Sequence, residues 1–131
     1  MSGAAPIRAR IVDRRREAGF TLVEMMVVMA VIAILVAIAV PALLGQRRRA
    51  ADAAATANAY QAVASIEAYH QDNGTYAGMT VAVLQASYDT GLDPALLLAD
   101  LTRSGYCVEA TVEGSTWSVR GPGGKAVAGT C

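Results

Sequence analysis

The chain has 131 residues, which is enough for one small domain. Eleven basic and eleven acidic residues give a formal net charge of zero, and this excludes a generally basic nucleic-acid binder as the default class. Hydrophobic residues make up 54% of the chain and charged residues 17%, which excludes a disordered protein and is high for a small soluble domain.

The first nineteen residues form a basic leader. Its five basic residues outnumber its two acidic ones, and they are Arg8, Arg10, Arg14, Arg15 and Arg16. A basic stretch before an apolar span stays on the cytoplasmic side of a membrane. A secretory signal peptide would instead end in a small-residue cleavage site, which Ala39-Val40-Pro41 matches poorly. We therefore expect residues 1–19 to lie in the cytoplasm.

The apolar residues are concentrated from Met25 to Leu44, where twenty consecutive residues carry no charge. As a helix this stretch is about 30 Å long, which matches the hydrocarbon core of a bilayer. Pro41 lies near its end, and a proline inside a helix removes one hydrogen bond and kinks the axis. The pattern predicts a membrane-spanning helix that bends near Pro41.

The residues around this apolar stretch form a specific motif. Residues 19–44 read G-F-T-L-V-E-M-M-V-V-M-A-V-I-A-I-L-V-A-I-A-V-P-A-L-L, which closely resembles the N-terminal signature of type IV pilins and type II secretion pseudopilins. The resemblance implies that a membrane-embedded aspartyl peptidase cleaves after Gly19 on the cytoplasmic side and then N-methylates Phe20. It also marks three further residues for assembly, namely Thr21, Leu22 and Pro41. Many family members carry a glycine near the middle of the span, where this chain has Ala33.

Glu24 is the one charge at the membrane edge of this segment. A carboxylate in hydrocarbon is costly and is usually paired. The resemblance supplies a partner, the N-terminal amine of Phe20 on a neighbouring subunit, and such a pair would set the axial register of an incoming subunit. The alternative is a glutamate that only sits among the lipid headgroups.

Three arginines, Arg47 to Arg49, follow the span. Anchoring in the headgroup region is the interpretation that we favour. Contact with DNA or with anionic partners in a fibre is the alternative, but no aromatic residues are interleaved with these arginines to support it. Nucleic acid is therefore an alternative partner that the sequence does not indicate.

Residues 50–72 are rich in alanine and contain no glycine or proline, which favours a helix. One face of this helix is expected to pack on a sheet, and it carries Ala55, Ala59, Ala62, Val63, Ile66, Tyr69 and His70. The opposite face is expected to carry Gln61, Ser65 and Asp72. Asn73-Gly74 is expected to end the helix.

The remaining chain predicts a connecting region and a small sheet. In the connecting region, Thr80 is expected to cap a short helix to Ala86, and Asp93-Pro94 is expected to open a turn that runs through Leu98 or Asp100. Alternating residues predict an antiparallel meander of three or four strands, which include Tyr106–Val112, Thr116–Arg120 and Ala126–Ala128. We expect Trp117 to pack against the helix.

Cys107 and Cys131 are the two cysteines of the chain. If this part of the chain is exported, a disulfide between them is permitted, and the loop of 25 residues would gain about 3 kcal/mol. Two free thiols in a cytosolic domain are the alternative.

Catalytic and metal sites are weakly indicated. His70 is the single histidine, and no catalytic set can be assembled around it. Asp89, Asp93 and Asp100 are candidates for calcium, which some major pseudopilins bind in this region, but scattered acidic residues on a loop are usually only solvated. Asn73-Gly74-Thr75 matches a common glycosylation pattern. We expect no enzyme activity, no metal and no cofactor.

The expected fold class is α+β, with a long, partly transmembrane N-terminal helix packed on a small antiparallel C-terminal sheet in the lollipop shape of pilins. The expected parts are a cleaved leader, a membrane and filament-core helix, an amphipathic continuation, a connecting region and a disulfide-closed sheet, at residues 1–19, 20–44, 45–73, 74–105 and 106–131. The resemblance implies a filament of like subunits, built by a prepilin peptidase, an assembly platform and cytoplasmic ATPases. The chain would first cross the cytoplasmic membrane once, with its C-terminal part outside, and then join an extracellular pilus.

Three rival functions stay open. The first is a pseudopilin of a type II secretion system. The second is a single-pass, membrane-anchored binding domain with an intact N-terminus, and the third is a secreted domain that discards its apolar segment. Adhesion, motility, DNA uptake and electron conduction are alternative roles for a pilus.

Overall fold

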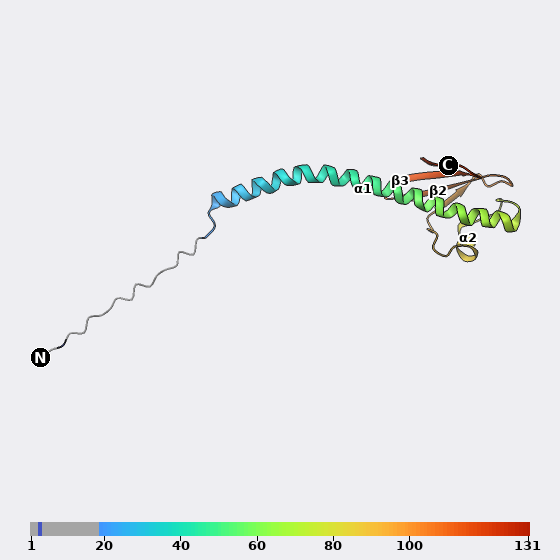
Figure 1. The fold of residues 1–131 in the computed structure, drawn as a ribbon, viewed down its shortest axis with the longest axis horizontal. Helices are drawn as coiled ribbons and strands as arrows, with labels where there is room; N and C mark the ends of the chain where they lie inside the picture. The colour runs from blue at the N-terminus through green and yellow to red at the C-terminus, as the bar shows by residue number, and fades with distance from the viewer. Residues whose placement is uncertain (1–2, 4–18) are drawn as a thin grey trace. The chain divides into compact units, whose positions relative to one another are not determined.

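A computed structural model describes residue 3 and residues 19–131. The rest of the expected leader lies outside the described residues. The fold is α+β, as expected. The described residues form two helices and four strands in this order: α1 (Leu22–Asn73), α2 (Val81–Ser87), β1 (Leu97–Ala99), β2 (Tyr106–Val112), β3 (Ser115–Gly121) and β4 (Ala126–Ala128) (Figure 1). The chain divides into two compact units, Met1–Ala39 and Val40–Cys131.

The N-terminal unit carries the first part of α1. The helix begins at Leu22 because Thr21 caps it, and the Thr21 hydroxyl oxygen accepts a hydrogen bond of 3.2 Å from the backbone N–H of Glu24. All described residues of this unit are exposed, so the local backbone hydrogen bonds and not a core define its structure.

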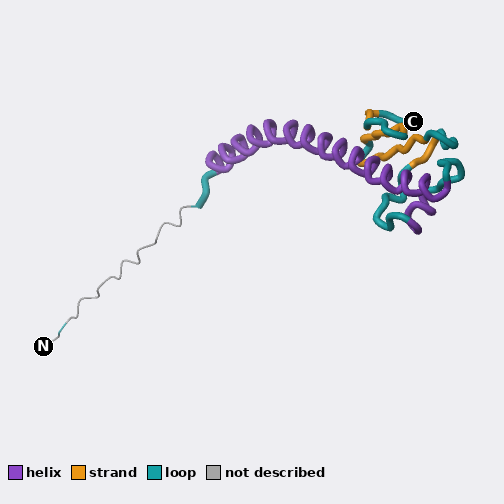
Figure 2. Tube along the Cα trace, turned by 45° about the vertical axis from the view of Figure 1, so that its right-hand side comes forward, coloured by secondary structure: helices purple, strands orange, loops and turns teal. Residues whose placement is uncertain are grey.

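The C-terminal unit packs the rest of α1 against the sheet. In Figures 1 and 2 the sheet and α2 lie on different sides of this part of the helix. The buried face of α1 confirms the expected stripe at Ala55, Ala59, Ala62 and Ile66, each of which has no exposed surface. Three of these four residues are alanines, whose small side chains let the sheet approach the helix backbone closely.

One residue of the expected polar face was placed wrongly. Ser65 is only 5% exposed, whereas Gln61 and Asp72 are exposed as expected. Tyr88 and Asp89, which follow α2, lie over this side of α1 beside Ser65. The spacing of apolar residues along the helix identifies the face that meets the sheet. It does not show that the residues after α2 lie beside Ser65 on another side of the helix.

The end of α1 and the start of α2 follow the local signals. Gly74 has a φ of 71° and donates its N–H to the carbonyl of His70 at 2.7 Å, which closes the last turn. The hydroxyl of Thr80 accepts from the N–H of Val83 at 3.2 Å and caps α2, as expected. Leu84 anchors α2, because its side chain is fully buried in the core.

The turn after Asp93 is shorter than expected. The Asp93 carboxylate accepts from the N–H of Ala95 at 2.8 Å, and the turn ends at Leu96. The expectation of a turn through Leu98 or Asp100 is wrong, because Leu97–Ala99 forms strand β1. Its pairing with β2, in which Leu98 lies opposite Val108, is a contact between distant parts of the chain that no local pattern predicts.

The sheet has the order β1-β2-β3-β4 and is antiparallel throughout. The strands expected from the alternating pattern are confirmed, and β3 extends one residue further at each end. Val108 pairs with Val119 and Tyr106 with Gly121, so one face of the sheet points to the core beneath α1. The core joins both helices and the sheet through its largest fully buried side chains, Ile66, Leu84, Val108 and Val119.

Candidate functional site

The expected cleavage point lies just before α1. Gly19 and Phe20 are outside the helix, which begins two residues after Phe20, and both are exposed. The Phe20 side chain retains 76% of its accessible surface. The peptide bond between these residues is therefore exposed and outside regular secondary structure.

Glu24 occupies the third position of α1, and its side chain is exposed. Thr21 and Glu24 form the spacing T-x-x-E, in which the threonine caps the third N–H and the negative side chain lies near the positive end of the helix dipole. This spacing was present in the sequence, and the sequence analysis missed its local meaning. The cap fixes where the helix starts and therefore where the carboxylate of Glu24 is presented.

The apolar part of α1 is uncovered along its length. The exposed fractions of its large apolar side chains run from 45% at Met25 to 77% at Leu22. Among the described residues, α1 is the one helix long and apolar enough to cross a membrane, and its most apolar window of 18 residues has a mean hydropathy of 3.1 with no buried share. Since burial of each such side chain is worth about 1.5–3 kcal/mol, this segment gains tens of kcal/mol from a lipid or protein cover.

Pro41 lies inside α1, at the second residue of the C-terminal unit. The backbone is helical on both sides of it. Gly45 follows four residues later in an exposed part of the same helix. The two residues with the lowest helix propensity in α1 therefore lie close together, at the end of the apolar stretch.

Asp52 attaches the β2–β3 hairpin to α1. Its carboxylate accepts hydrogen bonds from the Ser115 hydroxyl and, at 3.2 Å, from the indole N–H of Trp117. These two donors, Ser115 first, hold the pKa of Asp52 below its ordinary value of 3.8. Trp117 thus faces the helix as expected, but through a polar contact that the sequence analysis did not identify.

The three acidic candidates for calcium have separate protein partners. Asp89 accepts from the Gln61 amide at 2.9 Å, and this bond together with the N–H of Gly91 lowers its pKa. Asp93 accepts from the Asn58 amide at 3.2 Å, and Asp100 pairs with Arg120 at 2.7 Å. Within residues 19–131, no three acidic, cysteine or histidine side chains gather in a way that could hold a metal ion. The structure therefore does not bring these carboxylates together.

The aromatic residues near the end of α1 pack against one another. The His70 ring stacks on Tyr76 at a centroid distance of 4.2 Å, and Tyr76 in turn contacts Tyr106 at 4.8 Å. The Tyr76 hydroxyl donates to Glu67 at 2.9 Å, and burial raises the pKa of Tyr76 and of Tyr106. His70 therefore has a packing role in this arrangement.

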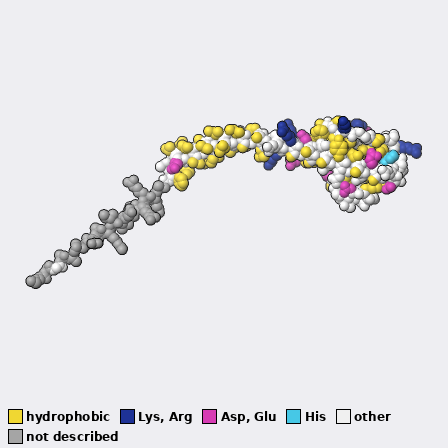
Figure 3. Space-filling view, viewed as in Figure 1, with side chains coloured by type: hydrophobic (Ala, Val, Ile, Leu, Met, Phe, Trp, Pro, Cys, Tyr) yellow, Lys and Arg dark blue, Asp and Glu magenta, His cyan; other side chains and the backbone are white. Residues whose placement is uncertain are grey.

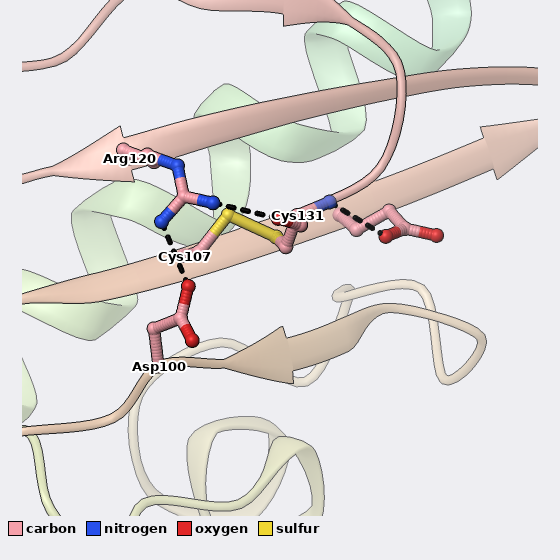
Figure 4. The surroundings of a disulfide bond; sticks show 5 residues. Asp100, Cys107, Arg120 and Cys131 are labelled. Carbon is pink, nitrogen blue, oxygen red and sulfur yellow. Dashed lines mark hydrogen bonds and ion pairs between the residues drawn. A yellow bond between two sulfur atoms is a disulfide. The ribbon is translucent and has the colours of Figure 1, made fainter.

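The C-terminal end is closed by covalent and polar contacts (Figure 4). Cys107 on β2 and Cys131 form a disulfide, which confirms the expected pairing. Arg120 donates to the Asp100 carboxylate at 2.7 Å and to the Cys131 carbonyl at 2.6 Å. The N–H of Cys131 donates to Glu109 at 3.1 Å. Cys131 is therefore held by β2, through Cys107 and Glu109, and by β3, through Arg120.

The N-terminal part of the chain matches a known family. Residues 14–40 match the family described as the prokaryotic N-terminal methylation motif. The chain is also 35% identical to the type IV wide pilus major component PilA4 of Thermus thermophilus over 103 residues, which is 78% of this chain and 79% of that protein. The chain belongs to the type IV pilin family.

This pilin also resembles a component of a secretion system. It is 34% identical to the type II secretion system core protein G of Aeromonas hydrophila over 64 residues, which is 49% of the pilin and 45% of that protein. No solved structure matches the pilin. The family assignment of the sequence analysis is therefore confirmed, and the pilin relative is matched over more of the chain than the secretion relative.

Proposed function

We propose that this pilin is the precursor of a structural subunit of a type IV pilus. A prepilin peptidase cleaves it after Gly19 and N-methylates Phe20. The match of residues 14–40 to the methylation motif is the observation that carries this proposal, because it spans the proposed cleavage point. The exposed backbone at Gly19 and Phe20 supports it.

Assembly uses the apolar part of α1. Before assembly this stretch crosses the cytoplasmic membrane once, with the leader inside and the C-terminal unit outside. In the filament it packs against copies of itself, delivered by an assembly platform and cytoplasmic ATPases. Glu24 pairs there with the amine of Phe20 on a neighbouring subunit. The uncovered apolar side chains support both stages, since each stage buries them.

A secretion pseudopilin is the second candidate. The similarity to the secretion protein favours it, but that match covers 49% of this chain against 78% for the pilus component. Imaging separates the two, because a pilus subunit yields long surface fibres. Fibres that contain this chain support the proposal, and a short periplasmic assembly would contradict it.

The N-terminus and mass of the mature protein test the processing step. We expect a chain that begins at methylated Phe20. Replacing Gly19 with valine should block cleavage and leave the full precursor, whereas Gly45→Ala, a matched change at a second exposed glycine, should leave processing unchanged. A mature chain that keeps residues 1–19 would indicate an anchored binding domain, and one that begins after Leu44 would indicate a secreted domain.

A further inference from the structure

A polar hollow of about 440 Å³ lies where α1 meets the β2–β3 turn. Arg47, Arg48 and Asp52 line it from the helix, and Glu113 and Ser115 line it from the turn. All of these residues belong to the C-terminal unit. Figure 3 shows basic side chains, in dark blue, and acidic ones, in magenta, close together on the part of α1 that follows its apolar stretch.

The position of the hollow along the helix matches the depth of lipid headgroups. Leu44 is the last residue of the apolar stretch, and Arg47 follows it by three residues, which is about 4.5 Å of helix rise. When the apolar stretch spans a bilayer, the first residues beyond it lie among the headgroups, where arginine is favourable. In that arrangement Arg47 and Arg48, which line the hollow, would lie at the level of the phosphates.

The charges that line the hollow are balanced. Two guanidinium groups can each donate paired hydrogen bonds to phosphate oxygens. Two carboxylates also line the hollow, Asp52 from the helix and Glu113 from the turn. Asp52 accepts from Ser115 and Trp117, whereas Glu113 makes no side-chain hydrogen bond or ion pair with another described residue. A purely anionic ligand would be attracted by the arginines and repelled by Glu113, whereas a zwitterion can pair its negative group with the arginines and its positive group with Glu113.

The backbone at Glu113 is a second, independent observation. Glu113 has a φ of 47° and Gly114 a φ of 81°, the conformation of a tight hairpin turn in which asparagine, aspartate or glycine is usual at the first position. A glutamate is strained there, and residues held in such conformations cluster at ligand sites. The chain thus has a glutamate beside the hollow at a position where asparagine, aspartate or glycine would give a more stable turn.

We propose that this hollow binds the headgroup of a phosphatidylethanolamine-type phospholipid, with the phosphate on Arg47 and Arg48 and the primary ammonium on Glu113. The inference rests on the membrane stage of the proposed function. It adds a defined lipid partner for the subunit before assembly. It also gives two of the three arginines that follow the span a specific ligand.

Lipid retention in nanodiscs tests this site. The full chain is placed in nanodiscs of equal phosphatidylethanolamine, phosphatidylcholine and phosphatidylglycerol, and the lipids that stay bound are measured by native mass spectrometry. We expect about tenfold enrichment of phosphatidylethanolamine over phosphatidylcholine, because a quaternary ammonium has no N–H to donate to Glu113. E113Q should remove this preference and raise the share of phosphatidylglycerol.

The arginine variants supply a matched control. The double variant R47Q/R48Q should lose bound lipid of all three kinds, whereas R49Q, a change at the adjacent arginine that does not line the hollow, should retain the wild-type pattern. Equal retention of the three lipids by the wild type, or equal behaviour of R47Q/R48Q and R49Q, would overturn the proposal.

Two further outcomes keep this inference separate from the proposed function. If R47Q/R48Q keeps wild-type lipid retention but forms no fibres, the hollow receives a neighbouring subunit and the lipid proposal is wrong. A chain that is cleaved after Gly19 and inserts in nanodiscs, yet shows no headgroup preference, contradicts this inference alone. A chain that does not insert contradicts the proposed function.

Discussion

Asp52 shows how one side chain on an otherwise alanine-rich helix decides where a hairpin attaches. The carboxylate accepts from a hydroxyl on β3 and from the indole of Trp117 two residues further along the same strand. Both donors favour its charged form, so the pKa is lowered in the folded chain and the contact is stronger when Asp52 is ionised.

The lowered pKa of Asp52 predicts a loss of stability in acid. The folded pKa lies below 3.8, so the contribution of this group is complete above that pH and is lost as the pH falls through the folded value. S115A removes the first donor and should move the titration of Asp52 upward, which NMR of its carboxyl carbon can follow. D52N should destabilise the C-terminal unit at pH 7, and its deficit should shrink below pH 3.8. A wild-type Asp52 that titrates at its ordinary pKa would contradict this assignment.

Glu24 is the residue on which assembly depends most directly under the proposed function. E24Q removes one partner of a pair that is buried in the filament and leaves the Phe20 amine uncompensated, so we expect about a hundredfold fewer fibres. E24D keeps the charge near the helix start and should assemble better than E24Q. Cleavage after Gly19 should continue in both, as the mass of the mature chain will show. Normal fibre yield with E24Q would contradict the pairing.

At the scale of elements, α1 is one helix with two kinds of surface. Before Gly45 its large apolar side chains are exposed, and after Ala50 one face of the helix is buried, mainly through alanines. The part before Gly45 has no apolar partner within the described chain, whereas the part after Ala50 packs against the sheet. The first part of α1 therefore needs lipid or another protein to bury it, whereas the second part is buried in the core of its own chain.

Two glycine substitutions compare an open helix position with a crowded turn. A Cβ at Gly45 meets nothing within 4 Å, so G45A should raise the free energy of unfolding of the helix by about 1 kcal/mol. A Cβ at Gly124 would overlap the Arg120 carbonyl oxygen, and G124A should lower the stability of the β3–β4 hairpin by about 1–3 kcal/mol. Thermal unfolding in detergent micelles measures both changes, and equal effects would contradict the crowding at the turn.

At the scale of the whole molecule, the C-terminal unit is small, and Cys131 links its end to the sheet. The disulfide joins Cys131 to β2, and Arg120 and Glu109 hold the backbone of the same residue. Small domains bury a limited core and gain much of their stability from such cross-links.

Reduction of the disulfide should therefore destabilise this unit by about 3 kcal/mol, the chain-entropy value for a loop of this size. Chemical unfolding with and without reductant measures the difference. R120Q breaks the polar contacts and leaves the cross-link in place, so its loss should be smaller, because these contacts are exposed. A larger loss for R120Q than for reduction would show that the polar contacts close the domain.

The sequence by itself determined what depends on neighbours along the chain. The helix stop at Gly74, the cap of α2 at Thr80 and the alternation of β2 and β3 are local signals, and each was found where it was expected. With two cysteines beyond the span, the disulfide had one intramolecular pairing available.

Tertiary structure alone decided what depends on parts of the chain that are distant in sequence. Strand β1 forms because it pairs with β2. Ser65 lies beside Tyr88 and Asp89 from the loop after α2, and Asp52 accepts a hydrogen bond from Ser115, which is 63 residues further along the chain. The hollow beside the arginines has the same origin, since its two walls come from α1 and from a turn more than sixty residues away. Hydrophobic period and turn chemistry act over a few residues, whereas these contacts form only when the sheet folds against the helix.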